Sequence, residues 1–273
     1  MPIPYGSAVT GRTRARSPAP AAIAPALEAG SQLSLFAPVE AVTFRHSRRA
    51  RRLTLRVFPH GVVEVVIPPR TARRRVEEFL HAHAGWIARA RQALLGAHAS
   101  PAVDPPARVH LPAVGERWRV VYRPGAGRLT EHSSATGRHL LLEGPADDQW
   151  RRTRLRTWLR DRGREVLIPW LGEVSAELGL TFADAAVRRQ RSRWGSCSAE
   201  RRISLNCALL FVEPELVRYL FIHELCHTRH LNHSRSFWRL VARFEPAYEA
   251  REAALSQAWR FVPAWVSYDP PGA

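Results

Sequence analysis

Alternating apolar and polar positions predict β-structure early in the chain. The alternation is clear over 53–57, and a β-branched run follows after a Pro-His-Gly turn, so we expect a β-hairpin over 43–68. Apolar residues then recur at helical spacing. They predict a helix over about 72–95 with Thr71 as its N-terminal cap.

The middle of the chain predicts a second group of strands and a long helix. Short strands are expected near 108–112, 117–123 and 138–143. Apolar residues at helical spacing then predict a helix over 146–179, which Pro169 should kink or split.

The next part of the chain predicts strand, loop, strand and helix in that order. The strands fall between 187 and 206, and the helix begins at Pro214, a residue that suits the first helical position. No Gly or Pro interrupts 215–231. The apolar residues of this helix lie near helical spacing and predict a half-buried helix: Leu216, Leu220, Ile222 and Leu225.

This helix carries the sequence His223-Glu224-Leu225-Cys226-His227, which matches the H-E-x-x-H signature. Residues i and i+4 share one helix face, so His223 and His227 can reach one zinc ion. Glu224 follows the first ligand and is therefore placed to face the attacking water as a general base. We read Cys226, which points off this face, as a small core residue.

A third ligand is needed, and two histidines compete for the role. His223, His227 and His230 would occupy successive turns and spread over about 10 Å, which is too far for a compact tetrahedral site. We favour His233, with Asn232 ending the helix in a left-handed conformation that turns the chain back. Ser234 or Ser236 would cap the following helix. A carboxylate from a later helix is the fallback: Glu245, Glu249 or Glu252.

The strand ahead of the motif helix suggests a place for substrate. An extended peptide can pair with a free strand edge, and Gly195 would permit close backbone approach. Arg193 could polarise a carbonyl or form a structural ion pair, and Trp194 is better explained as a core residue. With Asn206, these residues form the candidate substrate-binding set.

Composition adds a question about partners. The 273 residues carry a formal net charge of +17, and 45% are hydrophobic, enough for a sizeable core. The charge suggests an anionic partner, but all 41 basic residues are arginine, which indicates compositional bias; a solvated basic surface is the alternative. The arginines of the 146–179 helix are the best candidate nucleic-acid surface, and an exposed amphipathic face is the alternative: Arg151, Arg152, Arg154, Arg156, Arg160, Arg162 and Arg164.

Three cysteines without a C-x-x-C pair suit a reducing compartment. No apolar run is long enough to span a membrane, and the N-terminus lacks a signal-peptide layout, so we expect a cytoplasmic location. Residues 1–40 have a composition typical of a disordered tail.

One apolar pentapeptide interrupts this tail: Gln32, Leu33, Ser34, Leu35 and Phe36. It resembles the Q-L-S/D-L-F peptide by which many bacterial replication and repair proteins dock on the DNA sliding clamp. The apolar side chains could enter a groove while Gln32 fixes the register. Packing of the same island on its own domain is the alternative.

The motifs together resemble the YgjP-like metallopeptidase family, which is related to the WLM and SprT-like zinc proteases. The resemblance rests on Arg193 to Cys197, Ile203 to Asn206, His223 to His227 and Asn232 to Trp238. It is dense over 187–245 and looser back to about 43. It implies zinc bound by His223, His227 and His233, and Glu224 as general base. Because wider relatives cut proteins crosslinked to DNA, it also suggests DNA as a partner by analogy.

The expected fold is α+β: a zincin-like domain with a small antiparallel sheet packed on the H-E-x-x-H helix, preceded by a β-hairpin and helix. We expect a tail over 1–40, an N-terminal subdomain over 41–145, a metallopeptidase core over 146–268 and a short tail over 269–273. The expected function is zinc-dependent peptide hydrolysis near DNA. Two alternatives stay open: a hydrolase of nucleotide phosphoanhydrides, with Arg191 and Arg193 binding phosphates, and a DNA- or clamp-associated protein with structural zinc. Only three ligands are apparent, which counts against the last.

Overall fold

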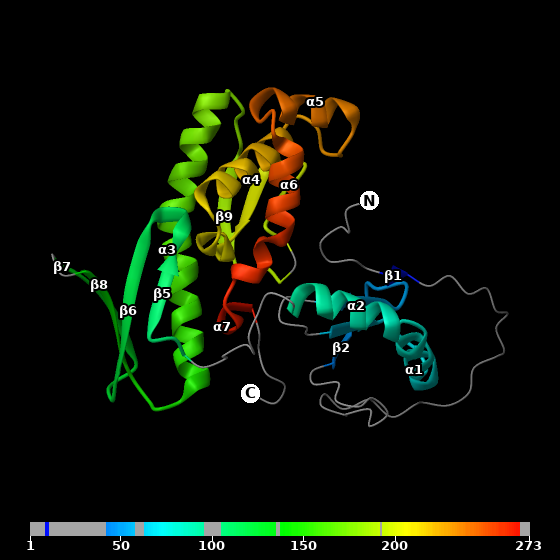
Figure 1. Cartoon of the computed structure of the whole chain (residues 1–273), viewed down its shortest axis with the longest axis horizontal. Coiled ribbons are helices and arrows are strands. Elements are labelled where there is room, and N and C mark those ends of the chain that lie inside the picture. Colours follow the sequence, from blue (N-terminus) through cyan, green and yellow to red (C-terminus); the bar gives the residue numbers. More distant parts are fainter. Residues whose placement is uncertain are drawn as a thin grey trace. The chain divides into compact units, whose positions relative to one another are not determined.

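The computed structural model describes residues 9–10, 42–57, 63–95, 105–134, 137–191 and 193–267. These residues form two compact units, which meet in sequence near residue 101 (Figure 1). The pentapeptide 32–36 lies outside the described residues. In the part of the chain that is described, no helix is long and apolar enough to cross a membrane.

The first unit is built on a four-stranded sheet with the order β1-β3-β4-β2. The strands are β1 (Val9–Thr10), β2 (Val42–His46), β3 (Thr54–Val57) and β4 (Val63–Ile67). β3 and β4 are antiparallel, which confirms the expected hairpin. β2 instead pairs with β4 in parallel.

Two helices cover this sheet where one was expected: α1 (Arg73–Ala82) and α2 (Ala84–Leu95). The helix breaks at His83, whose ring Nδ1 lies 2.7 Å from the carbonyl oxygen of Phe79. The Thr71 cap was also wrong. Ala72 occupies the cap position without a side-chain bond, and Thr71 donates its hydroxyl to Pro68. Val76 and Leu80 of α1 pack on the hairpin to form the core of this unit.

The second unit begins with a four-stranded sheet of order β5-β6-β8-β7. Its strands are β5 (Arg108–Leu111), β6 (Glu116–Arg123), β7 (Arg128–Ser134) and β8 (Gly137–Glu143), with a 3₁₀ turn, η2 (Pro112–Val114), after β5. The three expected strands are present, and β7 is additional. These strands fall within the expected N-terminal subdomain over 41–145, and in the structure they lie in the same compact unit as the motif helix.

Helix α3 (Asp148–Leu178) joins this sheet to the rest of the unit (Figure 1). Asp147 caps its start by accepting a hydrogen bond from the Trp150 amide, and Gly179 ends it in the left-handed conformation. Pro169 does not split the helix. Its neighbours Leu167 and Leu171 are fully buried, so packing on both sides of Pro169 offsets the lost backbone hydrogen bond.

A second sheet, of order β10-β11-β9, lies against the motif helix. Its strands are β9 (Asp184–Arg188), β10 (Gly195–Cys197) and β11 (Arg202–Asn206). β10 and β11 are antiparallel, but β9 and β11 are parallel, so the sheet is mixed where we expected an antiparallel one. β10 is an edge strand of this sheet.

The remaining elements are mostly helical. A 3₁₀ helix, η3 (Cys207–Phe211), leads into α4 (Pro214–Cys226), which is followed by α5 (Arg235–Phe244), α6 (Tyr248–Gln257), η4 (Ala258–Phe261) and α7 (Ala264–Ser267). α4 packs against α3, α5, α6 and β10. Strands and helices thus mix in one unit, which confirms the α+β fold class.

The arginine face of α3 is engaged within the protein. Arg156 donates to the carbonyl of Trp265, Arg160 and Arg164 pair with Asp161, and Arg162 pairs with Glu116. Arg151 pairs with Asp148, and Arg154 lies over the Trp150 ring. Arg152 also has an interaction partner. The structure therefore gives these side chains structural roles.

Glu116, the first residue of β6, is buried and lies at the centre of an ion-pair cluster between the β5-β6-β8-β7 sheet and α3. It is 3% exposed, and it accepts hydrogen bonds from Trp118 and Arg162 and pairs with Arg138. Burial acts to raise the pKa of Glu116, but the bonds and charges of Arg162, Trp118 and Arg138 outweigh it, so the pKa is lowered.

Glu116→Gln is expected to lower the free energy of unfolding by about 3 kcal/mol at neutral pH, because the half-buried Arg162 and the more exposed Arg138 lose the buried carboxylate that pairs with both. A lowered pKa contributes stability above the unfolded-state pKa, and this stability is lost as the pH falls through the folded-state pKa. Urea unfolding of parent and variant from neutral to acidic pH would check this. A difference between the two proteins that does not shrink in acid would contradict it.

Candidate metal centre

The H-E-x-x-H sequence lies at the C-terminal end of α4. The helix is buried along most of its length because Val217, Leu220 and Leu225 pack inward. It ends at Cys226, earlier than expected, with His227 as its C-cap. Thr228 contributes to this ending by donating its hydroxyl to the Leu225 carbonyl, 2.7 Å away.

The structure brings His223, His227 and His233 together. One ring nitrogen from each lies within 4.8 Å of the others. The Nε2 atoms of His223 and His233 are 3.1 Å apart, near the spacing of about 3.3 Å that two nitrogen ligands have on a tetrahedral zinc with bonds of about 2.05 Å. The arrangement can hold a metal ion on three imidazoles.

The chain reaches His233 by a different turn from the one we expected. Asn232 is not among the described non-glycine residues with positive φ, which are Arg70 and Arg201. The early end of α4 makes a left-handed terminator at Asn232 unnecessary. Ser234 then caps α5 by accepting from the Phe237 amide, as predicted for one of two serines.

His230 is held apart from this cluster and contributes through its backbone. Its carbonyl oxygen lies 2.9 Å from His227 Nδ1. This contact makes Nδ1 the protonated nitrogen and leaves the Nε2 lone pair of His227 free to bind a metal.

Glu224 is buried beside the three imidazoles, at 4% exposure. Burial raises the pKa of its carboxyl to about 8; the charge of Arg193 acts to lower that pKa and the charge of Glu252 to raise it. Burial together with the neighbouring histidines lowers the pKa of His223 to about 3. A cation at the imidazoles would favour the ionised form of Glu224.

Two buried polar atoms of this site have no hydrogen-bond partner among the described residues: Glu224 Oε2 and His223 Nδ1. Unsatisfied buried polar atoms are rare and costly, and they gather where a ligand or water completes the structure. The unpaired carboxylate oxygen of Glu224 therefore marks a place beside the imidazoles where a ligand or a water molecule can bind.

Glu252 of α6 lies next to His223, on the side of the ring that carries Nδ1. Its Oε2 atom accepts a 2.5 Å hydrogen bond from the hydroxyl of Tyr219, which is fully buried, and lies 4.0 Å from His223 Nδ1. Glu252 therefore lies beside Nδ1 of His223, whereas the other ring nitrogen, Nε2, faces His233. The carboxylate we considered as a fallback ligand is placed to orient a ligand instead.

Glu252→Gln is expected to weaken metal binding by about 10–100-fold, the usual cost of losing an outer carboxylate partner of a histidine ligand. The affinity can be measured by competition with a chromophoric chelator. Glu249→Gln, one turn earlier on α6 and exposed, is the matched control. Equal affinities in the two variants would contradict this role for Glu252.

The candidate substrate residues divide into two groups. Trp194 is buried, stacks on Trp259 and donates its indole N–H to the Leu255 carbonyl. The Asn206 amide donates to the carbonyls of Gln190 and Arg193, 2.8 Å from each. Both side chains thus hold the fold, and Asn206 acts by fixing the loop before β10.

Gly195 and Arg193 lie at the site itself. A Cβ atom on Gly195 would be 2.6 Å from Glu224 Oε1, so the edge strand β10 passes directly over the carboxylate. Arg193 is exposed, two residues before Gly195, and its charge acts to lower the pKa of the Glu224 carboxyl.

Gly195→Ala is expected to lower the kcat/KM of any hydrolysis at this centre by at least about 100-fold, because the added methyl would displace the Glu224 carboxylate from its place beside the imidazoles. Gly172→Ala on α3, where a Cβ meets nothing within 4 Å, is the control. Circular dichroism should show both variants folded. Normal activity of folded Gly195→Ala would contradict the close approach.

Two aromatic rings of the motif that follows His233, to which the sequence analysis gave no role in the site, enclose the histidines. Phe237 stacks on His227 with ring centroids 4.4 Å apart, and Trp238 stacks on His233 at 5.5 Å. The available signal was their place just after Ser234 in the resembling motif. They restrict ring rotation, so they help to hold the imidazoles in a fixed arrangement.

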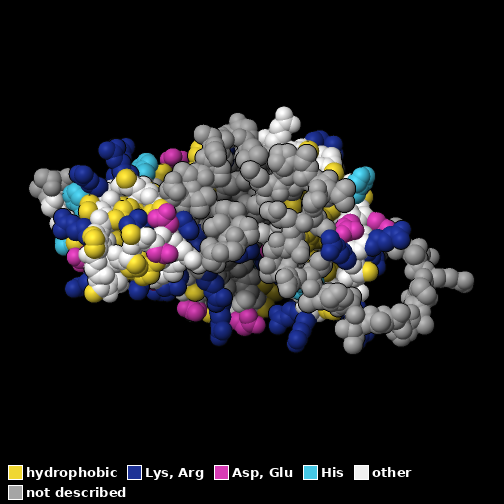
Figure 2. All heavy atoms as spheres, turned by 90° about the horizontal axis from the view of Figure 1, so that it is seen from below, with side chains coloured by type: hydrophobic (Ala, Val, Ile, Leu, Met, Phe, Trp, Pro, Cys, Tyr) yellow, Lys and Arg dark blue, Asp and Glu magenta, His cyan; other side chains and the backbone are white. Residues whose placement is uncertain are grey.

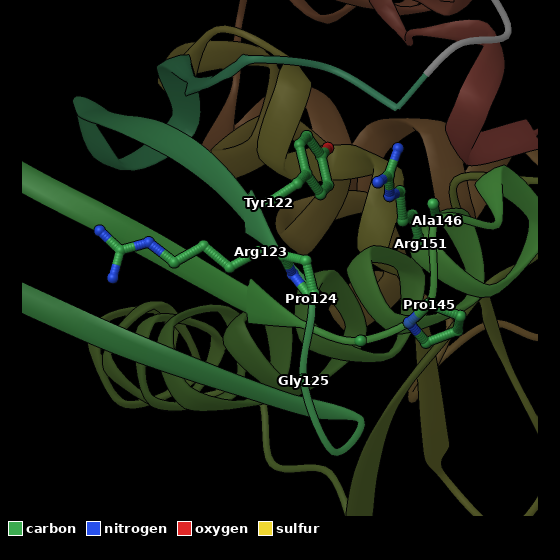
Figure 3. A pocket seen from close by; sticks show the side chains of 8 residues that line it. Tyr122, Arg123, Pro124, Gly125, Pro145, Ala146 and Arg151 are labelled. Carbon is green, nitrogen blue, oxygen red and sulfur yellow. The ribbon is translucent and has the colours of Figure 1, made fainter.

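A separate pocket of about 390 Å³ lies where the turn between β6 and β7 meets the start of α3 (Figure 3). Arg151 lies over the Tyr122 ring there, and the Tyr122 hydroxyl donates to the Pro106 carbonyl. None of the metal-centre residues lines this pocket.

Comparison with known protein families finds a metallopeptidase domain in this chain. Residues 51–258 match the family model described as YgjP-like, metallopeptidase domain. The crystal structure of the metallopeptidase zymogen abylysin from Pyrococcus abyssi matches with 29% identity, covering 32% of this chain and 88% of that chain, at a TM-score of 0.29. No curated protein matches the chain.

Proposed function

Because the chain belongs to the YgjP-like metallopeptidase family, we propose that it is a zinc-dependent peptidase in which Glu224 activates the attacking water. The family confirms the resemblance inferred from the sequence and establishes a metallopeptidase domain. The proposal adds the metal, its ligands and the roles of individual residues. The observation that carries it is the convergence of three imidazoles beside a buried carboxylate.

The donor set fits zinc. Three neutral imidazoles suit Zn²⁺, and catalytic zinc sites commonly combine three protein ligands with one open position. His223, His227 and His233 would hold the ion. His227 is prepared for this role by its contact with the His230 carbonyl, and His223 by the neighbouring Glu252.

Zinc held by these three histidines would supply Lewis-acid chemistry: it would polarise a peptide carbonyl and lower the pKa of a water molecule to about 7. Glu224 accepts the proton of that water as its oxygen attacks the carbonyl carbon. The same carboxyl then gives the proton to the amine that leaves when the C–N bond breaks. Arg193 is the proposed donor to the carbonyl oxygen as negative charge develops there.

The edge strand β10 is the proposed docking site for the polypeptide substrate. Its partner β11 occupies one side, and among the described residues no strand pairs with the other side. An extended peptide adding to this edge would run past Gly195, directly above Glu224. The absence of a Cβ there lets the two backbones and the carboxylate approach closely.

The direct test is to assay zinc-loaded protein against an unfolded polypeptide and, separately, against nucleoside triphosphates. We expect peptide cleavage that chelator removes and zinc restores. Hydrolysis of nucleotides alone would reject the peptidase and favour the phosphoanhydride hydrolase, with Arg191 and Arg193 binding phosphates. Metal binding without any hydrolysis would favour a structural metal in a DNA- or clamp-associated protein.

Two further proposals do not depend on the metal centre. The pentapeptide 32–36 is proposed to bind the bacterial sliding clamp, which a peptide spanning it can test, with Leu35 and Phe36 changed to alanine as control. Absence of binding would reject this partner. A cytoplasmic location is proposed because Cys197, Cys207 and Cys226 are free thiols.

A further inference from the structure

The sheet β5-β6-β8-β7 has two unlike faces. Its inner face packs on α3, where Trp118 meets Trp158 with ring centroids 5.4 Å apart and Leu140 is fully buried. Alternate residues point to the outer face, and its arginines are exposed on both β5 and β6. Figure 2 shows arginine and histidine side chains, in blue and cyan, around the end of the unit where β7 and β8 lie.

One row of basic side chains crosses all four strands on this outer face. Arg108 lies opposite Arg119, Arg119 opposite His139, and His139 opposite His132. On the neighbouring row His110 lies opposite Arg117. Like charges directly opposite each other destabilise a sheet, so the Arg108–Arg119 pair costs stability.

The protein supplies little counter-charge to this row. Neither Arg108, Arg117 nor Arg119 makes a hydrogen bond or ion pair with a described residue. Among the described outer-face positions the acidic residue is Glu143, which lies opposite both Arg123 and Arg128 two rows away.

Figure 3 shows the direction of the Arg123 side chain at the end of β6. It extends away from Tyr122, the preceding residue of the strand, and from Arg151 of α3. Arg117, Arg119 and Arg123 therefore project from the same face of β6.

We propose that this outer face binds the phosphate backbone of duplex nucleic acid. Arginine forks bind phosphates through paired, charge-assisted hydrogen bonds, and an anion there would relieve the repulsion within the row. The described outer-face positions carry no Phe, Tyr or Trp on which unpaired bases could stack, which favours contact with duplex phosphates over single strands.

A membrane surface fits this face less well. In the described part of the chain the exposed large apolar side chains are Leu231 and Phe261, and neither belongs to this sheet. Binding at a lipid interface usually needs apolar side chains that enter the bilayer as well as positive charge.

The proposed face points away from the metal centre. Its sheet packs on α3, and α3 in turn contacts α4 through Trp170 and Phe221, whose ring centroids are 5.1 Å apart. Figure 1 shows the sheet and α4 on different sides of α3. Nucleic acid bound there would leave the three histidines accessible, so the inference does not depend on the proposed peptidase activity.

The test compares two triple variants of the full chain that remove equal charge. Arg108, Arg117 and Arg119 become Gln in the patch variant; Arg202, Arg239 and Arg243, exposed elsewhere in the same unit, become Gln in the control. Binding is measured by fluorescence anisotropy with a labelled random-sequence DNA duplex at several salt concentrations.

The patch variant should bind DNA at least about tenfold more weakly. The negative slope of log K against log salt should become shallower by about three, one for each lost phosphate contact. The control should lose much less. The thermal midpoint of the patch variant should rise, because its like-charge repulsion is relieved.

Three results would overturn the proposal. The first is equal weakening of DNA binding in both triples, which would assign the affinity to overall charge. The second is parent protein that binds polyglutamate as tightly as duplex DNA, which would favour an acidic polypeptide. The third is a lower thermal midpoint in the patch variant, which would show that the arginines stabilise the fold.

Discussion

Glu224→Gln is expected to reduce the rate of peptide hydrolysis by about 100- to 10,000-fold, the usual contribution of a general base, while metal binding is retained. The amide cannot accept the proton of the attacking water, but it is nearly the same size as the carboxylate. The histidines keep their arrangement because His227 is held by the His230 carbonyl and by Phe237. Initial rates on an unfolded polypeptide would be measured with metal content determined by elemental analysis.

Asp184→Asn, an exposed carboxylate at the start of β9, provides the matched control for loss of one negative charge. It should cleave at the parent rate. A Glu224→Gln protein that contains metal and cleaves as fast as the parent would remove Glu224 from the chemistry.

His233→Ala is expected to weaken metal binding at least about 100-fold, more than the loss of an outer-shell partner, because one of three ligands disappears. His230→Ala is the informative control. It removes the competing imidazole but keeps the backbone carbonyl that His227 contacts. Its metal affinity should stay close to that of the parent.

Calorimetric titration of zinc into both metal-free proteins measures this difference. The opposite result, with His230→Ala losing metal and His233→Ala keeping it, would reverse the assignment of the third ligand. Loss in neither variant would point to a ligand set that includes a carboxylate.

Much of the candidate site could be predicted from the sequence because its histidines lie close together along the chain, on one helix and the turn that follows it. The i, i+4 spacing of His223 and His227 has meaning only on a helix, and Pro214 marks where that helix begins. His233 was preferred to His230 on reach, and the structure places His233 Nε2 3.1 Å from His223.

The errors came from competition between local signals. No Gly or Pro ends α4, so its apolar pattern predicted a longer helix, but Thr228 bonds back to the Leu225 carbonyl and the helix stops. Thr71 is a good cap in isolation, yet its hydroxyl donates to the Pro68 carbonyl. In both cases a side chain had two possible backbone partners.

Features that depend on tertiary structure could not be predicted. The approach of Gly195 to Glu224 joins residues from different elements, and so does the contact of Glu252 with Tyr219. The arginines of α3 looked like a nucleic-acid surface until the fold supplied Glu116 and the Trp265 carbonyl as partners. Within the described part of this sheet, Arg108 and Arg119 make no hydrogen bond or ion pair, and only the strand register reveals that they lie opposite each other.

The most direct test of the zinc peptidase is a titration of zinc into the metal-free protein while cleavage of an unfolded polypeptide is followed. Cleavage should rise in proportion to zinc and level off at one equivalent in the parent. Glu224→Gln should bind the same equivalent and cleave nothing. Cleavage without metal, or cleavage by Glu224→Gln at the parent rate, would contradict the proposal that a zinc ion on three histidines and the Glu224 carboxylate act together.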